Sequence, residues 1–155
     1  MSTFQTYLKA GYPLLWVQTH EEGRAISTLS QEASGYGCYS WDIIDGLKEH
    51  ATGKLQPVSD PTKAIQAAHS LPENSILFLK DFHKFIGTVQ VFRTLKNIIP
   101  VLKSSYRHIV IISPVTQIPT ELEKDITVYS FPLPSVEELK AVAEKIISEN
   151  ELHRL

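Results

Sequence analysis

Two apolar stretches of this sequence end in polar residues of the kind that bind Mg²⁺ and phosphate. Residues 76–79 are four consecutive apolar residues followed by Lys80 and Asp81, and a P-loop ATPase holds Mg²⁺ with a carboxylate at such a strand end. Residues 13–17 form a second apolar stretch, which leads into segment 19–24. A phosphate loop there requires G-x-x-x-x-G-K-[ST], because backbone N–H groups surround the phosphates and the lysine reaches them. Since segment 19–24 reads T-H-E-E-G-R, we expect no ATP hydrolysis by this domain.

The ends of the predicted strands supply the candidate interaction residues. In an ATPase interpretation Asp81 would hold Mg²⁺ and Ser113 would sense the γ-phosphate, but Phe82 stands where an acidic residue should polarise water. In the simpler interpretation, which we favour, Asp81 accepts backbone hydrogen bonds and caps a loop. We therefore expect no catalytic, cofactor-binding or metal-binding residue here. The candidate interaction residues are Glu21, Glu22, Arg24, Asp81, Phe82 and Ser113.

The first hypothesis is a non-catalytic domain that serves recognition or assembly, and the second is weak phosphate or nucleotide binding at segment 19–24. Thr19 and Glu22 have the spacing of a capping box, so Thr19 is expected to begin a helix whose free N–H groups favour anions. Arg24, just past the first turn, opposes the helix dipole unless a carboxylate such as Glu21 pairs with it. A surface ion pair is the simpler interpretation of Arg24, and a partner-facing role is the alternative.

A third hypothesis places a phosphorylation site at Asp81. Glu21 and Glu22 after the first strand, Asp81 after the third and Ser113 after the fourth resemble the arrangement of a phospho-receiver domain. A receiver also needs a lysine at the end of its fifth strand to pair with the phosphoryl oxygens. Residues 130–132 read S-F-P and do not supply it, so we rank this hypothesis last.

The charge and the cysteine content exclude several classes of partner. The 155 residues include 15 Lys and Arg against 17 Asp and Glu, a net charge of −2, with no block of like charge. Nucleic-acid and membrane-surface binding draws on clustered basic residues, so we expect neither partner. The six histidines lack the spacing of a Zn²⁺ site, and Cys38 has no second cysteine with which to form a disulfide. With no signal sequence and no membrane-length apolar run, the chain is expected in the cytoplasm.

The alternation of strand and helix patterns predicts an α/β fold with a five-stranded parallel sheet and helices on both faces. We expect residues 1–155 to form one such domain. The predicted strands are residues 13–17, 38–44, 76–79, 109–112 and 126–131. Residues 45–58 contain two glycines, Pro57 and mixed charges, and are expected to form a loop or a short irregular helix.

Helix starts and ends are marked by capping patterns. Ser2 with Gln5 and Ser135 with Glu138 form capping boxes for the first and last helices, and Asp60 before Pro61 is a strong helix start. A helix beginning near Thr88 is expected to kink or end at Pro100, because proline has no N–H to donate. The last helix is expected to face inward with Val136, Leu139, Val142, Ile146 and Ile147.

Several blocks of the chain resemble one family closely. They are residues 12–17 with 21–24, 79–83, 118–124, and 131–134 with 137–139, which occur in order over nearly the whole chain. The chain is similar to the N-terminal domain of the AAA-type ATPases encoded by a hypothetical reading frame of red-algal plastids and cyanobacteria.

The resemblance implies a degenerate P-loop domain of AAA/RecA-like architecture at the start of a longer AAA-type ATPase. ATP and Mg²⁺ are then expected only in the downstream AAA module, and the family's ATP-binding residues have no matching positions here. The partners implied are that module and other proteins, with homo-oligomers formed by the full-length protein. The resemblance also implies a cyanobacterial cytoplasm or plastid stroma, and a role in photosynthesis or inorganic-carbon regulation.

Overall fold

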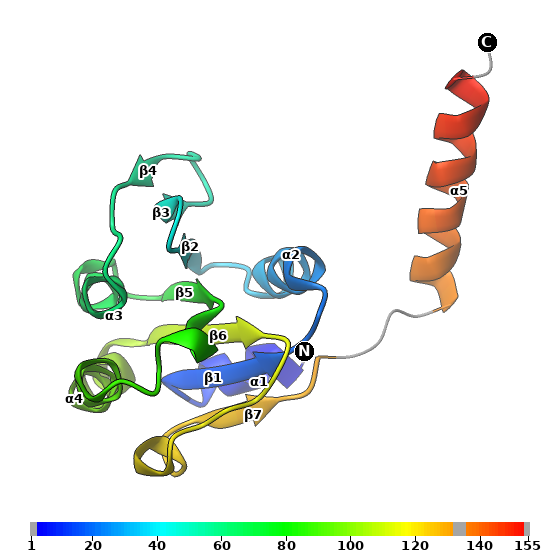
Figure 1. Ribbon diagram of the computed structural model, residues 1–155. Helices are drawn as coiled ribbons and strands as arrows, with labels where there is room; N and C mark the ends of the chain where they lie inside the picture. Colours follow the sequence, from blue (N-terminus) through cyan, green and yellow to red (C-terminus); the bar gives the residue numbers. More distant parts are fainter. Residues whose placement is uncertain (1–2, 132–135, 154–155) are drawn as a thin grey trace.

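A seven-stranded sheet forms the centre of the protein, in a computed structural model that describes residues 3–131 and 136–153 (Figure 1). The strands lie in the order β4-β3-β2-β5-β6-β1-β7. Their bounds are β1 Leu14–Gln18, β2 Gly37–Asp42, β3 Gly46–Glu49, β4 Leu55–Gln56, β5 Ser75–Lys80, β6 Arg107–Ser113 and β7 Thr127–Tyr129. Strands β2, β5, β6, β1 and β7 run parallel, whereas β3 and β4 extend the β2 edge in antiparallel fashion.

The inner strands are buried because helices cover both faces of the sheet. Every side chain of residues 76–79 and 109–112 is fully buried, at 0% exposure. Unbroken apolar runs suit a parallel strand that is covered on both faces, and they allowed these two strands and β1 to be predicted correctly. β7 is shorter than the predicted segment 126–131.

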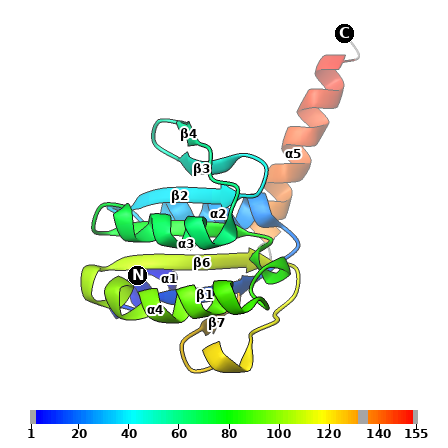
Figure 2. The same cartoon turned by 60° about the vertical axis from the view of Figure 1, so that its left-hand side comes forward.

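Two pairs of helices cover the two faces. Helices α1 (Thr3–Lys9) and α2 (Glu22–Glu32) lie on one face, and α3 (Pro61–Ser70) and α4 (Val89–Ser105) lie on the other (Figures 1 and 2). Short 3-10 helices span Phe82–Lys84 and Thr120–Leu122. Alternate residues of β1 enter the two cores: Leu15 packs with the α1 and α2 side, and Trp16 packs with the α3 and α4 side.

The sheet differs from the predicted five strands because residues 45–58 are not a loop. They contain β3 and β4, and β3 pairs with β2 through a tight turn at residues 43–45. Gly46 closes this turn with φ of +80°, and a Cβ at this position would lie 2.3 Å from the Gln56 carbonyl oxygen. The Asp45-Gly46 pair is a hairpin signal that outweighed the mixed charges around it.

Two of the predicted helix starts have different outcomes. The Asp60 carboxylate accepts a hydrogen bond from the Thr62 N–H at 2.8 Å and caps α3, as predicted. The predicted cap at Thr19 is wrong: the N-cap of α2 is Glu21, which makes no side-chain cap bond. The Thr19 hydroxyl instead accepts from the Glu21 N–H at 3.0 Å, so it shapes the turn that precedes the helix. The predicted caps at Ser2 and Ser135 lie outside the described residues.

Helix α4 continues past Pro100 to Ser105, so the proline does not end it. Proline removes one backbone N–H, whose partner would be the carbonyl of Lys96, four residues earlier. Lys96 is an exposed residue, where water can satisfy that carbonyl. The apolar face of α4, with Leu95, Ile98 and Leu102 buried against the sheet, holds both halves in place.

The last helix, α5 (Val136–His153), does not present the expected apolar residues to the core. Leu139, Ile146 and Ile147 are 56%, 53% and 57% exposed. Figures 1 and 2 both draw α5 apart from the sheet, whose two faces are already covered by the other helices. The side chains of Val136 and Val142 lie outside the described residues. Among the described residues, no helix has both the length and the apolar composition that crossing a bilayer requires.

Candidate functional site

The carboxyl ends of β1, β5 and β6 meet at one edge of the sheet. Gln18 is in register with Ser113, and Lys80 is in register with Ile112. Backbone hydrogen bonds continue this register beyond the strands, from the Thr19 N–H to the Ser113 carbonyl at 2.9 Å and from the Asp81 N–H to the Ile112 carbonyl at 3.3 Å. The structure therefore brings the predicted strand-end residues together, at the edge where open α/β sheets bind ligands.

Ser113 is buried at this edge and its hydroxyl is already used. Its Oγ accepts a hydrogen bond from the Trp16 indole N–H at 3.0 Å and donates to the Val115 carbonyl. The side chain of Ser113 is only 2% exposed. A buried, doubly bonded hydroxyl shapes the loop after β6 and is not presented to solvent.

Asp81 and Phe82 have opposite exposures. Asp81 is exposed, adopts the left-handed conformation with φ of 56°, and begins the 3-10 helix without a side-chain cap bond, so the predicted capping by its carboxylate is wrong. Phe82 is fully buried, with its ring 5.8 Å from Trp41 and 5.9 Å from Phe85 between centroids. Phe82 thus anchors the loop in the core and leaves Asp81 at the surface.

The start of α2 is closed by an ion pair. The Arg24 guanidinium contacts Glu21 Oε2 from Nη2 at 2.9 Å and from Nε at 3.0 Å, as the surface-pair interpretation predicts. Its central carbon lies 4.5 Å from the centroid of the Phe131 ring. An exposed pair of this kind contributes about 0.2–1 kcal/mol, so its main effect is to fix the orientation of Arg24.

Carboxylates dominate the charge beside this helix start. Glu22 Oε1 lies 3.9 Å from the Lys80 ammonium. Partial burial raises the pKa of Glu22, the Lys80 charge lowers it, and the carboxylates of Asp81 and Asp42 raise it. Across the described residues, no group of three or more His, Cys, Asp or Glu side chains is arranged to hold a metal ion.

Segment 19–24 does not fit a nucleotide phosphate. All of its residues are described, and none has the positive φ that lets a glycine-rich loop turn its N–H groups inward. The N–H groups of Thr19 and Glu21 already donate within the protein, at 2.9 and 3.0 Å. The segment also carries two carboxylates, Glu21 and Glu22, whose charges disfavour an anion.

The strand order also does not fit the receiver-like hypothesis. Receiver domains have the strand order 2-1-3-4-5, in which the first strand lies between the second and the third. Here β1 lies between β6 and β7, and β2 is the neighbour of β5. The acidic residues after β1 therefore do not take the place that they hold in a receiver.

An apolar patch that the sequence analysis did not select lies at the turn between β2 and β3. Ile44 is 87% exposed, Ile43 is 42% exposed, and Leu55 on the edge strand β4 is 53% exposed. With Pro57 and Val58 these residues line a hollow of about 310 Å³. The Asp42 carboxylate holds the turn by accepting from the Ile44 N–H at 2.9 Å. The adjacent Ile43-Ile44 pair before Asp45-Gly46 was the signal for this patch in the sequence.

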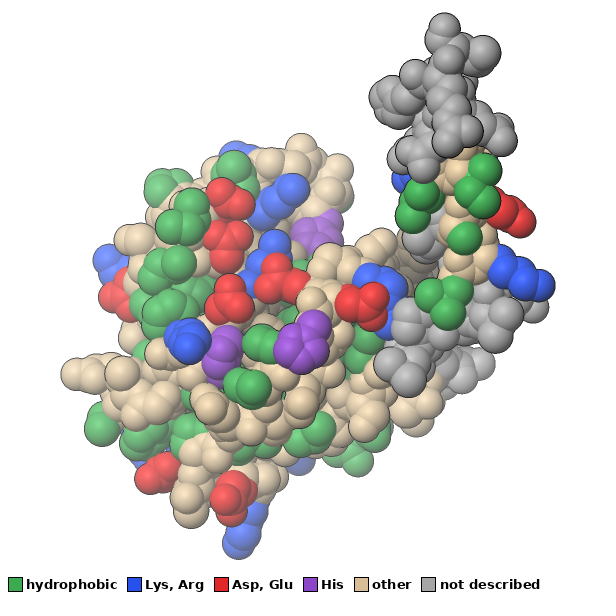
Figure 3. Space-filling view, turned by 45° about the vertical axis from the view of Figure 1, so that its right-hand side comes forward, with side chains coloured by type: hydrophobic (Ala, Val, Ile, Leu, Met, Phe, Trp, Pro, Cys, Tyr) green, Lys and Arg blue, Asp and Glu red, His purple; other side chains and the backbone are tan. Residues whose placement is uncertain are grey.

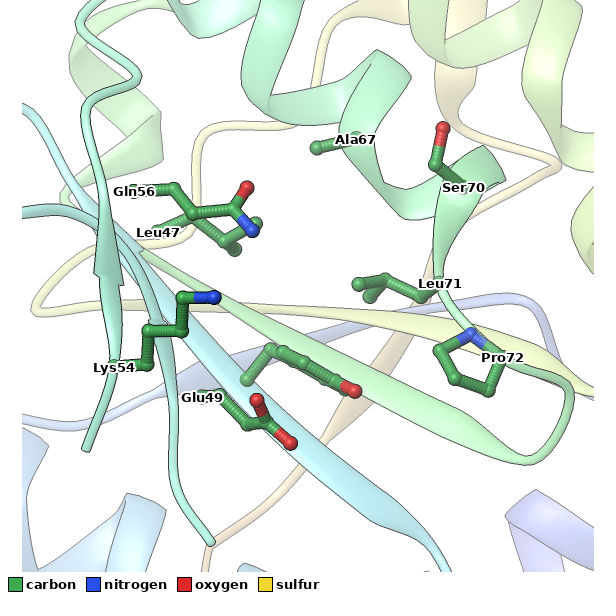
Figure 4. Close-up of a pocket in the computed structure, with 9 residues that line it drawn as sticks. Leu47, Glu49, Lys54, Gln56, Ala67, Ser70, Leu71 and Pro72 are labelled. Carbon is green, nitrogen blue, oxygen red and sulfur yellow. The ribbon is translucent and has the colours of Figure 1, made fainter. Parts of the chain in front are cut away.

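A second hollow, of about 370 Å³, lies between the β3–β4 hairpin and the end of α3 (Figure 4). Lys54 and Gln56 extend toward Ala67 and Leu71 across it. Its lining contains both Glu49 and Lys54, so it has no net preference for a charged ligand. On the face shown in Figure 3, acidic and basic side chains are likewise interspersed.

Comparison with known proteins gives a family and relatives. Residues 1–131 match the model of the SpoVK-like AAA ATPase N-terminal domain. The chain is 33% identical over 142 residues to the "Uncharacterized AAA domain-containing protein ycf46" of Guillardia theta, covering 88% of this chain and 28% of that protein. The protein of the same description from Pyropia yezoensis is 32% identical over 138 residues, with 86% and 28% covered. The chain thus spans well under a third of the length of these relatives.

Solved structures share the fold at low sequence identity. The Thermotoga maritima RuvB Holliday junction branch migration motor matches with a TM-score of 0.54 and 12% identity, over 96% of this chain and 48% of that one. A DNA replication initiation factor matches with a TM-score of 0.55 and 14% identity, over 95% of this chain and 49% of that one. Identities this low show a common fold and nothing about activity.

Proposed function

The chain belongs to the SpoVK-like AAA ATPase N-terminal domain family, and we propose that it serves recognition or assembly in a longer AAA-type ATPase without hydrolysing ATP itself. The observation that carries this proposal is the connection between β1 and α2. A hydrolytic domain needs a phosphate cradle at that point, and the chain has a turn in which the Thr19 and Glu21 N–H groups are bonded internally and which carries two carboxylates.

The electrostatics of the strand ends support the same conclusion. Mg²⁺ and ATP phosphates are held in P-loop proteins by a lysine, a hydroxyl and a carboxylate acting together. Here Ser113 is buried against Trp16, and Lys80 lies beside Glu22. Among the described residues Asp81 therefore has no free Ser113 hydroxyl beside it and forms no ion pair with Lys80, so the three groups do not act together at the sheet edge.

The apolar patch of Ile43, Ile44 and Leu55 supplies a surface for recognition. Single exposed apolar side chains are common, but adjacent ones at a tight turn beside an edge strand form a contiguous contact surface. We assign this patch to the AAA module of the longer protein, because the curated relatives extend well beyond the part that this chain matches. We further propose that the longer ATPase acts in photosynthesis or inorganic-carbon regulation, in a cytoplasm or a plastid stroma.

Nucleotide binding provides the first test. Isothermal titration of the 155-residue chain with Mg·ATP is expected to give no isotherm in the micromolar range, and its Tm is expected not to rise with micromolar ATP. Titration of the Arg24→Ala variant with Mg·ATP tests the alternative hypothesis, in which the start of α2 binds phosphate weakly. A micromolar isotherm for Mg·ATP contradicts the proposal, and loss of that binding in Arg24→Ala places the anion at α2.

Association with the AAA module provides the second test. The chain is mixed with the separately produced AAA module of the Guillardia theta relative, and complex formation is followed by analytical ultracentrifugation. Ile44→Asp is expected to abolish the complex, because it places a charge in an apolar contact. Val128→Asp is the matched control, since Val128 is 48% exposed on β7, at the opposite edge of the sheet from β4. Equal loss in both variants, or no complex with the unmodified chain, contradicts the assignment.

A further inference from the structure

A hollow of about 450 Å³ lies beside α2, on the face of the sheet opposite α3 and α4. Helix α2 packs Ala25, Ile26 and Leu29 into the core of that face. The part of α2 that lines the hollow includes three small residues, Gly23, Ser27 and Ser30. A Cβ at Gly23 would meet no atom within 4 Å. The small residues therefore leave open space over the polar part of β2 and β3.

Basic side chains line the opposite wall of this hollow. Lys48 comes from β3 and Lys80 from the end of β5. Lys80 has one distant counter-ion, Glu22 at 3.9 Å, and Lys48 has no salt-bridge partner among the described residues. None of the described residues that line the hollow is acidic. The hollow thus holds two ammonium groups against one carboxylate at its margin, which favours an anion.

His50 and Ser40 form a fixed polar floor between the lysines. The Ser40 hydroxyl and His50 Nε2 are hydrogen-bonded, and the imidazole stacks on Phe78 at 6.0 Å between centroids with an interplanar angle of 11°. Burial lowers the pKa of His50, and the nearby charges of Lys48 and Lys80 lower it further. Both effects favour the neutral imidazole, so the hollow's positive charge comes from the two lysines.

Hydroxyl groups complete the lining from the helix side. The Ser30 oxygen is enclosed and has no nitrogen or oxygen partner among the described residues. Its polar neighbour is the thiol of Cys38, a weak hydrogen-bonding group. Ser27 is exposed one turn earlier on the same helix. An incoming anion can therefore accept a hydrogen bond from the exposed Ser27 hydroxyl on one side and from ammonium groups on the other.

We propose that this hollow binds the phosphoryl group of a small phosphorylated molecule between Lys48, Lys80 and the hydroxyls of α2. Lysine binds phosphate as a point charge, and two ammonium groups match the charge of about −1.5 to −2 on a phosphoryl group better than the single charge of a carboxylate. The site is distinct from segment 19–24, because Arg24 and Glu21 are not part of the lining. The domain then carries a ligand site without a phosphate loop, lined by other residues than the surface proposed for assembly.

Titration of the 155-residue chain with inorganic pyrophosphate, followed by amide chemical shifts, tests the site. Saturable shifts are expected at Ser27, Ser30, Lys48 and His50. Lys48→Gln is expected to weaken binding about tenfold, the usual effect of losing a hydrogen bond to a charged group. Ser27→Leu should block the hollow without changing any charge, and leucine is a good helix former, so the variant is expected to fold. Circular dichroism verifies the fold of both variants.

Matched controls separate this site from general charge attraction. Lys54→Gln removes the same charge from an exposed position outside the hollow and should leave binding unchanged. Titration with succinate should give no shifts at the same amides. Three results overturn the inference: no saturable binding at millimolar pyrophosphate, equal weakening in Lys48→Gln and Lys54→Gln, or succinate binding as tightly as pyrophosphate. Weakening found only in an Arg24→Gln variant also overturns it, because the anion would then bind at the start of α2. Failure here is distinguishable from failure of the proposed function. A micromolar Mg·ATP isotherm that Lys48→Gln leaves unchanged does not arise from this hollow, and the AAA-module test probes the patch of Ile43, Ile44 and Leu55.

Discussion

The Trp16 indole N–H donates to the Ser113 hydroxyl at 3.0 Å, across 97 residues of sequence. Trp16 lies in the middle of β1, and Ser113 ends the neighbouring strand β6. The same N–H also lies 3.2 Å from the Val115 carbonyl oxygen, so strand and loop are tied together. Ser113 lies at the strand-end position suited to sensing phosphate, but its hydroxyl holds the loop that follows β6.

Replacing Ser113 is therefore expected to affect stability. Ser113→Ala removes the acceptor of the Trp16 N–H, but the Val115 carbonyl remains as a partner, so the free energy of unfolding should fall by only about 1 kcal/mol. Urea denaturation measures the change. Ser104→Ala is the control, since the Ser104 hydroxyl donates to the Val101 carbonyl at an exposed site and should alter stability less. Equal effects of the two variants would argue against a structural role for Ser113.

Gly46 is expected to tolerate no side chain. Its φ of +80° disfavours an L-residue, and a Cβ would lie 2.3 Å from the Gln56 oxygen and 2.9 Å from the Val58 nitrogen. Gly46→Ala should lower the free energy of unfolding by at least about 2 kcal/mol, because backbone atoms must move as well. Gly53→Ala is the comparison: φ there is +71°, but a Cβ would meet nothing within 4 Å. A loss at Gly46 no larger than that at Gly53 contradicts the clash.

Phe82 is expected to be a major contributor to core stability. It is fully buried between the Trp41 and Phe85 rings. Phe82→Ala should cost about 3–5 kcal/mol, the range for truncating a buried phenylalanine. Chemical denaturation gives the value, and Phe82→Leu should recover much of it by refilling the cavity. A cost below about 1 kcal/mol would mean that the loop after β5 is not held by this ring.

Stability is expected to fall in mildly acidic solution because of His108. This side chain is 1% exposed, its Nδ1 lies 2.7 Å from the Tyr12 carbonyl oxygen, and its Nε2 has no partner among the described residues. Burial lowers the pKa of His108, although the Tyr12 hydrogen bond raises it. The unfolded chain then binds more protons than the folded one below pH about 6.5, the ordinary histidine value, and unfolding becomes easier as the pH falls.

Thermal denaturation at pH values from about 7.5 down to about 5, on both sides of the ordinary histidine pKa of about 6.5, measures this effect. The Tm of the unmodified chain should fall across this interval, and His108→Gln should flatten the slope even though it lowers the Tm at pH 7. His50 also has a lowered pKa, so His50→Gln should flatten the slope by a separate increment. A slope unchanged by His108→Gln would show that this imidazole titrates alike in both states.

Local chemistry made several elements predictable and left others hidden. Asp60 before Pro61 specified the start of α3 because the carboxylate and the proline act on neighbouring backbone groups. Thr19 and Glu22 also had the spacing of a helix start. The Thr19 N–H, however, extends the pairing of β1 with β6 through its hydrogen bond to Ser113, and α2 begins later, with Glu21 as its N-cap. Residues 45–58 were misjudged because their mixed charges concealed a hairpin set by Gly46.

By itself the sequence determined the α/β class, the buried strands and the absence of a phosphate loop, because each depends on residues close together in the chain. Only the tertiary structure decided that β1 lies between β6 and β7, that Ser113 bonds to Trp16, and that Lys48 faces α2 across a hollow. Strand order and side-chain convergence depend on pairing between distant segments, and no local spacing encodes them. The missing loop was visible in the sequence, but what the strand ends do in its place was not.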